Sequence, residues 1–571
     1  MNGLSDEDLK ADRQAHLEQI LESDAEKKLI VAGPGTGKTH TFGAVLDQVG
    51  EPRLVLTFLN RLVDDLSDKL ADRAYVYSFH GFARWVLHTR RVEGVTTQVR
   101  YFPALTQLVV EDLRLTDGTE LSQLQYGQLF RNLVDDPLLD LALRSGTYYD
   151  AVGHDDSVYR VLKGFQAEDR KIPQYQQVLV DEFQDFSALE VAFIEELGTK
   201  SPVLIVGDDD QAIYAFRDAR PEPIRELAGG DEYENFELPY CSRCTEVLVA
   251  ATHTVVNEAR AIDLLDGRLD KRFVCYLPDK RPDSEAFPRI VHAVCSTQST
   301  VSPYMGRYIA GRIREIDPAD IAVSREDGRP TVLVIGPKPF LPQVETVLRN
   351  EFQNVVSAEK SELELDPLYA VQLLQREEAS RLGWRILLQI RQPPGWEDMV
   401  ARALTEHAEL FDLLTEDFRN EHLRASEVLR KLNNGETVDH EERKLLANVL
   451  GVPEDALEEF LADEEDDHPE VDPLEPVIML TSLMGAKGLQ ADHVFVVGVN
   501  AGHFPRHNGQ PTNEEVCQLL VALTRTRRSC TLVSTTRLAG VRKATSRFVA
   551  WLEPHIEGIY VDKTYLETRG Y

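Results

Sequence analysis

The stretch that decides the fold of this sequence reads A-G-P-G-T-G-K-T and covers residues 32–39. The residues before it, 28–31, predict a short buried strand, and Thr41–Val49 predict the helix that the loop leads into. Glycines let the backbone approach a phosphate closely, and the N-terminus of the helix adds its positive end. The pattern predicts a P-loop whose residues bind a nucleotide: Ala32, Gly33, Pro34, Gly35, Thr36, Gly37, Lys38 and Thr39.

Two side chains distinguish this loop from a glycine-rich turn that binds nothing. Lys38 would reach the β- and γ-phosphates, and the hydroxyl of Thr39 would bind Mg²⁺. A turn that binds no ligand does not require a lysine and a threonine at these positions. P-loops nevertheless occur in kinases, GTPases, transporters and DNA motors, so the rest of the chain must distinguish these classes.

Length and charge describe a large, acidic protein. The chain has 571 residues, 43% of them hydrophobic, with 62 Lys plus Arg against 96 Asp plus Glu and a net charge of -34. About four domains are expected for this length. An even spread of this charge would argue against a nucleic-acid partner. The charge is segregated, however, since residues 454–475 hold twelve acids and no Lys or Arg, whereas 516–552 hold seven Lys or Arg and no acid.

Cysteine use and hydropathy favour a cytoplasmic protein without structural disulfides or a membrane span. The chain has only six cysteines, and no apolar run approaches the ~20 residues that a membrane-crossing helix needs. No signal-like segment follows the N-terminus. Cys241 and Cys244 form a C-x-x-C pair, but the absence of a second pair or a histidine cluster nearby argues against zinc.

Short β-branched runs alternate with helical patterns over most of the chain. They occur in two groups, before about residue 235 and after about residue 285. This alternation is typical of parallel sheets with helices on both faces, so we expect two doubly wound α/β domains. Residues 91–170 and 371–474 are mainly helical in periodicity and read as insertions. The acid run in the second is most simply a solvated linker, with a partner-binding or DNA-mimicking role as the alternative.

A buried strand, residues 178–180, ends in two carboxylates. In a P-loop fold Asp181 can hold Mg²⁺ through water, and Glu182 can orient and deprotonate an attacking water. This pair favours hydrolysis over phosphoryl transfer to a small substrate. The alternative is that both acids merely cap the following helix.

The next strand, residues 203–206, leads into a polar loop that contains aromatic residues. Such a loop lies at the carboxyl edge of the sheet, where ligands bind. Gln211 can sense a γ-phosphate by hydrogen bonding. Tyr214 and Phe216, beside Arg217, suit stacking on nucleic-acid bases, whereas the alternative makes both rings part of the core.

At this point the chain resembles the UvrD/Rep-type superfamily 1A DNA helicases. The resemblance spans nearly the whole chain, and the motifs follow the order of the family. They are Gln14, Thr57–Arg61 (T-F-L-N-R), Ser78–Phe82 (S-F-H-G-F), Asp181–Asp185 (D-E-F-Q-D), Gly207–Ala219 (G-D-D-D-Q-A-I-Y-A-F-R-D-A), Leu238–Arg243 (L-P-Y-C-S-R), Lys487–Leu489 (K-G-L) and Val521–Arg525 (V-A-L-T-R).

The resemblance implies two RecA-like P-loop NTPase domains, each with a mainly helical insertion. The first domain would comprise residues 1–90 and 171–235, around an insertion at 91–170. The second would comprise 236–370 and 475–571, around a reduced acidic insertion at 371–474.

The resemblance also implies roles for single residues. Gln14 would read adenine, and Gly488 would contact the nucleotide. Arg243 and Arg525 would point from the second domain across a cleft at the γ-phosphate, where an arginine stabilises the charge that develops in phosphoryl transfer. The DNA-binding residues would be Phe58, Asn60, Arg61, His80, Tyr214, Phe216 and Arg217.

The sequence also departs from the family pattern. Ser242 stands where the family has a tyrosine that stacks on adenine, with Tyr240 nearby but out of register. Met484 replaces a histidine, and Gln490 replaces a glutamate. The second insertion is smaller than the family's accessory domain. These departures bear on base selectivity and on unwinding rather than on the fold.

The leading interpretation is an ATP- and Mg²⁺-dependent motor that moves along single-stranded DNA or on a tailed duplex, 3′ to 5′ as the resemblance implies. The alternative is an ATPase switch in a repair or anti-phage complex, with a protein partner such as a separate nuclease. A P-loop kinase or GTPase leaves Arg243 and Arg525 unexplained.

Overall fold

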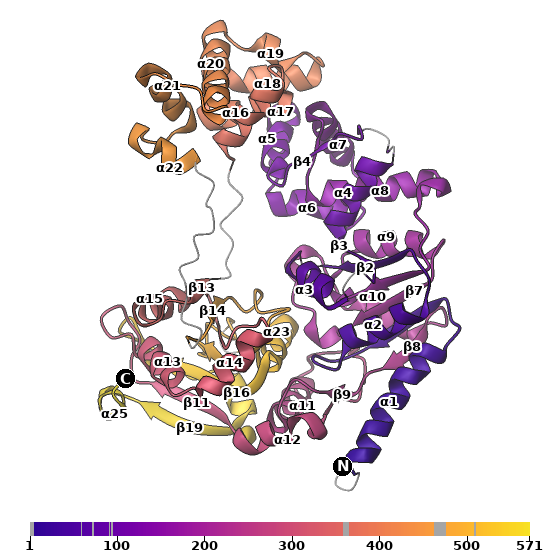
Figure 1. Ribbon diagram of the computed structural model, residues 1–571, viewed down its shortest axis with the longest axis vertical. Helices are drawn as coiled ribbons and strands as arrows, with labels where there is room; N and C mark the ends of the chain where they lie inside the picture. Colours follow the sequence, from indigo (N-terminus) through magenta and orange to yellow (C-terminus); the bar gives the residue numbers. More distant parts are fainter. Residues whose placement is uncertain are drawn as a thin grey trace.

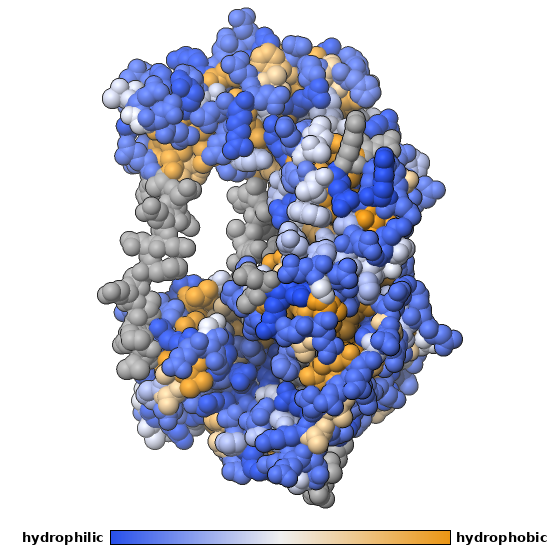
Figure 2. Space-filling model, turned by 45° about the vertical axis from the view of Figure 1, so that its right-hand side comes forward, coloured by the Kyte–Doolittle hydropathy of each residue, from blue (hydrophilic) through white to orange (hydrophobic). Residues whose placement is uncertain are grey.

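Two parallel β-sheets organise the protein (Figure 1). The computed structural model describes residues 5–571 except 59, 71–72, 91, 93–94, 358–364, 462–474 and 508–509, and it describes only the backbone of 60–62, 65 and 459. Both sheets are flanked by helices, which confirms the expected α/β fold class. Figure 2 shows a mostly hydrophilic surface with scattered hydrophobic patches, as the net charge of -34 requires.

The first sheet has six parallel strands in the order β3-β2-β6-β7-β1-β8. The strands are β1 (Lys27–Val31), β2 (Arg53–Thr57), β3 (Tyr75–Ser78), β6 (Gln177–Val180), β7 (Val203–Gly207) and β8 (Glu234–Glu237). Because β6 and β7 are buried on both faces, their residues 178–180 and 203–206 form continuous apolar runs rather than alternating ones. The covering helices are α1 (Asp6–Glu22), α2 (Lys38–Gln48), α3 (Asn60–Leu70), α9 (Ala188–Gly198) and α10 (Glu222–Gly229).

The register aligns the carboxyl ends of the three central strands. Ile30 of β1 pairs with Val206 of β7, and Val180 of β6 pairs with Ile205 of β7. The loops that follow β1, β6 and β7 therefore leave the same edge of the sheet, where ligands bind in parallel α/β folds.

The second sheet has seven parallel strands in the order β13-β14-β12-β15-β16-β11-β19. They are β11 (Ile290–Cys295), β12 (Val332–Ile335), β13 (Val355–Ser357), β14 (Ile478–Thr481), β15 (Ala491–Val497), β16 (Thr526–Thr535) and β19 (Ile556–Val561). The helices around it are α13 (Tyr304–Arg314), α14 (Pro318–Glu326), α15 (Leu341–Glu351), α23 (Asn513–Thr524), α24 (Arg547–Trp551) and α25 (Lys563–Arg569), and a small hairpin pairs β17 (Arg537–Leu538) with β18 (Val541–Arg542).

A separate segment lies between the two sheets. It contains a two-stranded parallel pair and two helices: β9 (Tyr240–Cys241), β10 (Val274–Cys275), α11 (Glu246–Arg260) and α12 (Leu277–Ala286). Figure 1 shows α11 and α12 at the base of the molecule, between the sheets. The expected boundary at 235 falls inside β8, because β8 still pairs with β1 of the first sheet.

Two helical segments interrupt the sheets. The first contains α4 (Phe79–Thr89), α5 (Leu105–Asp117), α6 (Gln123–Arg131), α7 (Pro137–Tyr149) and α8 (His154–Ala167), with the short pair β4 (Arg100–Tyr101) and β5 (Ala151–Val152). The second contains α16 (Pro367–Arg376), α17 (Arg381–Arg391), α18 (Trp396–Thr405), α19 (Leu410–Leu413), α20 (Glu416–Asn433), α21 (His440–Leu450) and α22 (Leu457–Leu461). The expected boundary at 370 falls inside α16, whose side chains pack into the helical core.

The two helical segments pack on each other, although each interrupts a different sheet. Figure 1 shows α16–α22 at the top, beside α5 and α7. Arg385 of α17 forms an ion pair of 2.8 Å with Asp112 of α5, and both side chains are fully buried. The rings of Phe102 and Tyr369 stack with their centroids 5.5 Å apart. A buried, bonded interface therefore joins the two segments.

The cysteines and the helices of the described residues show no disulfide and no membrane-crossing segment. All six cysteines are free and buried. Among the described residues, no helix combines the length and the apolar character needed to cross a membrane.

Candidate active site

The P-loop follows β1 directly, and its last two residues, Lys38 and Thr39, begin α2. The amide of Ala32 donates to the carbonyl of Gly207 at 3.0 Å, which holds the loop against the end of β7. Gly35 and Gly37 have φ of 70° and 96°, in the left-handed region that glycine tolerates best. Gly37 caps α2 without a side-chain hydrogen bond, so the N-terminal amides of this helix face the site.

A hollow of 530 Å³ opens in front of this loop, and we call it the P-loop hollow. Its walls come from both sheets and from the segment between them. Most of the candidate catalytic and nucleotide-binding residues line it: Pro34, Gly35, Gly37, Lys38, Thr39, Asp181, Glu182, Gln211, Arg243, Gly488 and Arg525. Residues that lie far apart in the sequence thus converge on one cleft.

The segment that carries Arg243 packs tightly on the P-loop. The amide of Ser242 donates to the carbonyl of Gly35 at 3.0 Å. A Cβ at Gly35 would lie 2.4 Å from the Cβ of Arg243, so no larger residue fits there. Arg243 comes from the segment between the sheets, just after β9, rather than from the second sheet itself.

Lys38 extends into the hollow beside the two carboxylates. Its Nζ is buried and has no hydrogen-bond partner among the described residues, and it lies 3.6 Å from Oε1 of Glu182. A buried ammonium without a hydrogen bond is costly, and the phosphate oxygens of a nucleotide would supply the missing acceptors. The residues present therefore fit a nucleotide phosphate.

The two carboxylates have opposite pKa shifts. Burial, reinforced by the charge of Glu182, raises the pKa of Asp181 to about 6. Burial would also raise the pKa of Glu182, but the ammonium groups of Lys38 and Lys487 outweigh it and lower this pKa to about 2. A buried acid that gains from a nearby cation fits Mg²⁺, with Asp181 and the Thr39 hydroxyl as the available oxygen ligands.

Glu182 is held in a strained backbone conformation. Its φ is 54°, in the left-handed region, which costs about 1–3 kcal/mol for a residue other than glycine. Nε2 of Gln184 donates to its carboxylate at 2.6 Å and fixes the side chain. Strain of this kind is common at functional sites, where it orients a reacting group.

Lys487 belongs to the site, although the sequence analysis placed it only in the K-G-L motif and expected its neighbour Gly488 to contact the nucleotide. Its ammonium is buried, donates to the backbone carbonyl of Gln211, and pairs with Asp185 at 2.6 Å. Burial, only partly offset by this ammonium, raises the pKa of Asp185 to about 7. The K-G-L motif was the signal that could have identified this lysine.

Arg525 connects the second sheet to the loop after β7. It follows α23 and precedes β16, and its Nη2 donates to Oε1 of Gln211 at 2.9 Å. Arg243 lies close by, with Nη1 donating to the carbonyl of Thr524 at 3.3 Å. Two guanidinium groups thus face the P-loop hollow from outside the first sheet.

A second hollow of 350 Å³ adjoins the P-loop, and we call it the tyrosine hollow. It is lined by Gln14, Thr36 and Gly37, with Tyr240 and Tyr276 on the far side. Its position fits a nucleotide base, and Tyr276 supplies an aromatic ring where Ser242 supplies none. Sequence reasoning missed Tyr276, because it lies directly before α12, far from the motif that contains Ser242.

Four candidate DNA-binding residues form one cluster beside this cleft. The ring of Phe58 lies 5.4 Å from that of Tyr214, and Tyr214 lies 6.0 Å from Phe216. The guanidinium of Arg217 covers Phe58 at 4.7 Å. Phe216 is 47% exposed, whereas Tyr214 is only 8% exposed. Phe216 is therefore available for stacking, and the ring of Tyr214 packs against it in an edge-to-face contact.

The other candidates for DNA binding differ in position. His80 is buried, and its ring centroid lies 4.9 Å from that of His154. Burial, with the charge of His154 next, lowers the pKa of His80 well below its usual value, so this ring is neutral. The side chains of Asn60 and Arg61 lie outside the described residues.

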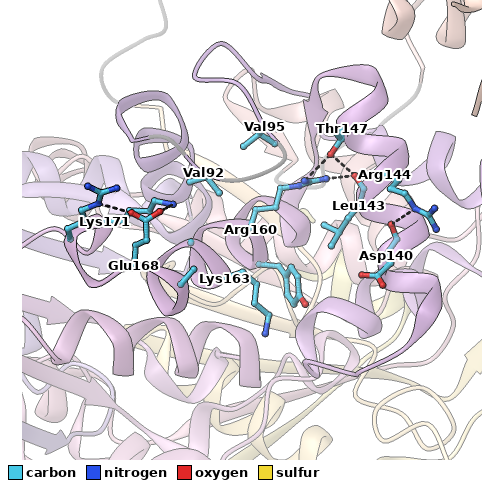
Figure 3. A pocket seen from close by; sticks show the side chains of 14 residues that line it. Val92, Val95, Asp140, Leu143, Arg144, Thr147, Arg160, Lys163, Glu168 and Lys171 are labelled. Atoms are coloured by element: carbon cyan, nitrogen blue, oxygen red, sulfur yellow. Dashed lines mark hydrogen bonds and ion pairs between the residues drawn. The ribbon is translucent and has the colours of Figure 1, made fainter. Parts of the chain in front are cut away.

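A further hollow lies elsewhere, between α7 and α8 (Figure 3). It measures 1230 Å³ and contains none of the candidate site residues. Figure 3 shows Arg160 directed at Thr147 and at the carbonyl of Leu143, and Lys171 paired with Glu168. These basic groups stabilise the helical segment itself, and the hollow lacks the carboxylate pair of the P-loop hollow.

Comparison with known proteins agrees with this geometry. The family model described as "AAA domain" matches residues 17–217, which include the P-loop and the two carboxylates. DNA helicase II of Escherichia coli is 26% identical over 446 residues, covering 66% of this chain and 59% of that protein. The ATP-dependent DNA helicase UvrD1 of Mycobacterium tuberculosis is 25% identical over 338 residues, covering 47% and 43%.

The chain is thus similar to UvrD-type DNA helicases. A shorter stretch of 106 residues is 35% identical to DNA helicase II of Haemophilus influenzae and covers 15% of that protein. The chain thus spans less than two thirds of the length of these relatives, with 59% for the Escherichia coli protein.

Proposed function

We propose that this UvrD-like protein is an ATP-driven motor that moves along single-stranded DNA. The observation that carries the proposal is the convergence in the P-loop hollow of Lys38, the carboxylates of Asp181 and Glu182, and two arginines from outside the first sheet. A P-loop alone fits many nucleotide-binding proteins. A hydrolytic carboxylate pair that faces Arg243 and Arg525 fits a cleft that closes around ATP.

The residues of the hollow divide the hydrolytic work. Lys38 and the amides at the start of α2 bind the β- and γ-phosphates. Glu182 orients the attacking water and accepts its proton. Arg243 and Arg525 stabilise the charge that develops on the γ-phosphate. Mg²⁺, held by Thr39 and Asp181, supplies further neutralisation of phosphate charge when it is bound.

Closure of the cleft provides the mechanical step. Arg525 contacts Gln211 directly, so the second sheet and the loop after β7 are joined at this point. When ATP is bound, the same arginine gains the γ-phosphate as a partner, and it loses that partner after hydrolysis. The cleft between the two sheets would therefore close when ATP binds and open after hydrolysis, by a hinge motion between the sheets.

The DNA path is proposed to run over the cluster of Phe58, Tyr214, Phe216 and Arg217. This cluster lies next to the nucleotide site, since Lys487 lies 5.7 Å above the ring of Tyr214 and also contacts Gln211. A change at the γ-phosphate can therefore reach the ring that supports Phe216. Movement from 3′ to 5′ is proposed from the similarity to the UvrD-type helicases.

The test is a translocation assay on single-stranded DNA labelled at either end, together with a tailed duplex. The proposal predicts ATP-dependent arrival at the 5′ end and no arrival at the 3′ end. Arrival at the 3′ end would contradict the polarity, and no movement in either direction would contradict the motor.

A second candidate is a DNA-stimulated ATPase switch within a larger repair or defence complex that includes a separate nuclease. The buried pair of Asp112 and Arg385 favours it, because this pair fixes one helical segment on the other. A rigid helical unit suits a docking platform better than a moving accessory domain. DNA-stimulated hydrolysis without translocation or strand separation would support this candidate over the motor.

A further inference from the structure

Three consecutive buried aspartates follow β7, directly before Gln211. Asp208, Asp209 and Asp210 have exposures of 0%, 2% and 8%. Their carboxylate oxygens lie within 4.8 Å of one another, a spacing that suits a bound cation. Three like charges in a dry interior repel one another strongly, so something must neutralise them.

Lys271 occupies the centre of this cluster. Its Nζ lies 2.5 Å from Asp208, 2.9 Å from Asp209 and 2.8 Å from Asp210. Burial alone would lower the pKa of Lys271, but the three carboxylates raise it above its usual value. The ammonium group therefore stays charged and takes the position that a metal ion would otherwise fill.

Two arginines complete the neutralisation from the outside. Arg268 forms two hydrogen bonds of 2.7 Å with the carboxylate of Asp210. Arg225 binds Asp209 at 3.1 Å and also donates to the carbonyl of Asp266. Cys517 of α23 also faces the cluster, and burial raises the pKa of its thiol, so it stays neutral. His253 lines the same hollow as Asp208 and Asp210, and the mostly exposed Asp270 lies 3.7 Å from Arg268. Three cations thus balance three carboxylates.

Asp208 connects the cluster to Gln211 by a hydrogen bond. Its carboxylate accepts a hydrogen bond of 2.7 Å from Nε2 of Gln211, and Oε1 of Gln211 accepts one of 2.9 Å from Arg525. An ionised carboxylate only accepts and a guanidinium only donates, so the two contacts fix which way the amide faces. The carbonyl oxygen of Gln211 is therefore the atom turned toward Arg525 and the P-loop hollow.

We propose that Lys271, supported by Arg268, is a positioning residue for ATP hydrolysis, because its ammonium binds the carboxylate of Asp208 and so holds the amide oxygen of Gln211 toward the hollow. This inference rests on the proposed function. In that orientation Gln211 accepts a hydrogen bond from the attacking water instead of donating one to the γ-phosphate. Lys271 itself touches neither the nucleotide nor the water.

Removal of the ammonium should change hydrolysis in a pH-dependent way. In Lys271→Met, burial and mutual repulsion would favour protonation of the aspartates. A protonated Asp208 can donate to Gln211, and the amide is then free to turn. We expect kcat to fall about 10- to 100-fold near neutral pH, with KM for ATP changed by less than about twofold. Activity should recover as the pH rises, because Asp208 then ionises.

Two further variants separate positioning from simple loss of structure. Asp208→Asn is nearly isosteric and cannot ionise, so its kcat should be low at every pH. Arg225→Gln removes one cation from the same cluster but does not touch Asp208, so its kcat and pH profile should match the wild type. Thermal unfolding of each variant checks the fold, and Asp208→Asn decides the question if Lys271→Met does not fold.

The outcomes distinguish this inference from the proposed function. Wild-type protein without any ATP hydrolysis would contradict the proposed function. Wild-type hydrolysis with an unchanged kcat in Asp208→Asn, or with an equal loss at every pH in a folded Lys271→Met, would overturn the positioning role. A kcat that falls in both variants, and that recovers at high pH only in Lys271→Met, supports it.

Discussion

The amide oxygen of Gln211 and the guanidinium of Arg525 share a hydrogen bond of 2.9 Å. Gln211 follows β7 of the first sheet, and Arg525 precedes β16 of the second. The bond therefore joins the two sheets at the edge of the P-loop hollow. A nucleotide bound in this hollow would lie beside Gln211, whose contact with Arg525 depends on how the two sheets are placed.

Arg525→Ala should reduce turnover far more than nucleotide affinity. The guanidinium is expected to act on charge that exists mainly in the transition state, where such an arginine contributes about 10³-fold or more. Steady-state kinetics should show this loss in kcat, with a much smaller change in KM for ATP. Arg528, which pairs with Asp320, gives the matched control Arg528→Ala. Equal losses in kcat and in affinity would argue against the transition-state role.

Phe216→Ala should weaken binding of single-stranded DNA and leave DNA-independent hydrolysis intact. The ring is 47% exposed and is supported by Tyr214, and a stacked base contributes about 1–3 kcal/mol. Fluorescence anisotropy with a labelled oligonucleotide measures the change in Kd. Tyr560 is another exposed aromatic, on β19, and Tyr560→Ala should leave the Kd unchanged. An unaltered Kd in Phe216→Ala would remove this ring from the DNA path.

Arg385→Met should destabilise the protein by about 3–5 kcal/mol, because it leaves Asp112 charged and buried without its partner. Tyr149 still donates to Asp112 at 2.9 Å but brings no charge. Chemical denaturation measures the loss in the unfolding transition of the helical unit. The double variant Arg385→Met with Asp112→Asn removes both charges and should recover much of the stability. A single variant as stable as the wild type would mean that the pair does not hold the two segments together.

Because His292 is buried, we expect the free energy of unfolding to decrease as the pH falls below about 6.5. Burial lowers the pKa of this histidine on β11 to about 4, so the folded state binds its proton later than the unfolded state does. The stabilisation is complete above the unfolded value and is lost as the pH falls toward 4, at up to about 1.4 kcal/mol per pH unit.

The pH dependence of thermal unfolding measures this contribution. His292→Gln should be less sensitive to pH than the wild type over that window. His440, whose side chain is 73% exposed, provides the control His440→Gln, which should follow the wild type. An identical pH dependence in His292→Gln and the wild type would contradict the assignment.

The sequence predicted the parts of the fold that local patterns encode. The apolar run expected as a strand, residues 178–180, lies within β6, and the P-loop connects β1 to α2 as its glycines require. Parallel α/β topology then brings the ends of β6 and β7 to the P-loop, so the hollow could be anticipated from motif order. The departure at Ser242 was visible, but the ring of Tyr276 that borders the tyrosine hollow was not.

The features that the sequence could not predict depend on pairs of residues far apart in the chain. Asp112 and Arg385 lie 273 positions apart, and neither belongs to a recognisable motif. Lys271 contacts Asp209 across 62 positions. Buried ion pairs of this kind arise from packing between segments, which leaves no periodic signal. The domain boundaries expected at 235 and 370 fall inside β8 and α16, because periodicity locates a core more accurately than its boundaries.

The most direct test of the central claim is the rate of ATP hydrolysis with and without single-stranded DNA, in the wild type and in Lys38→Ala. The account predicts hydrolysis in the wild type that rises several-fold with DNA, and no hydrolysis in Lys38→Ala under either condition. The exposed Lys200, paired with Asp169, gives the control Lys200→Ala, which should match the wild type. Hydrolysis that DNA does not stimulate, or that survives in Lys38→Ala, would contradict the account.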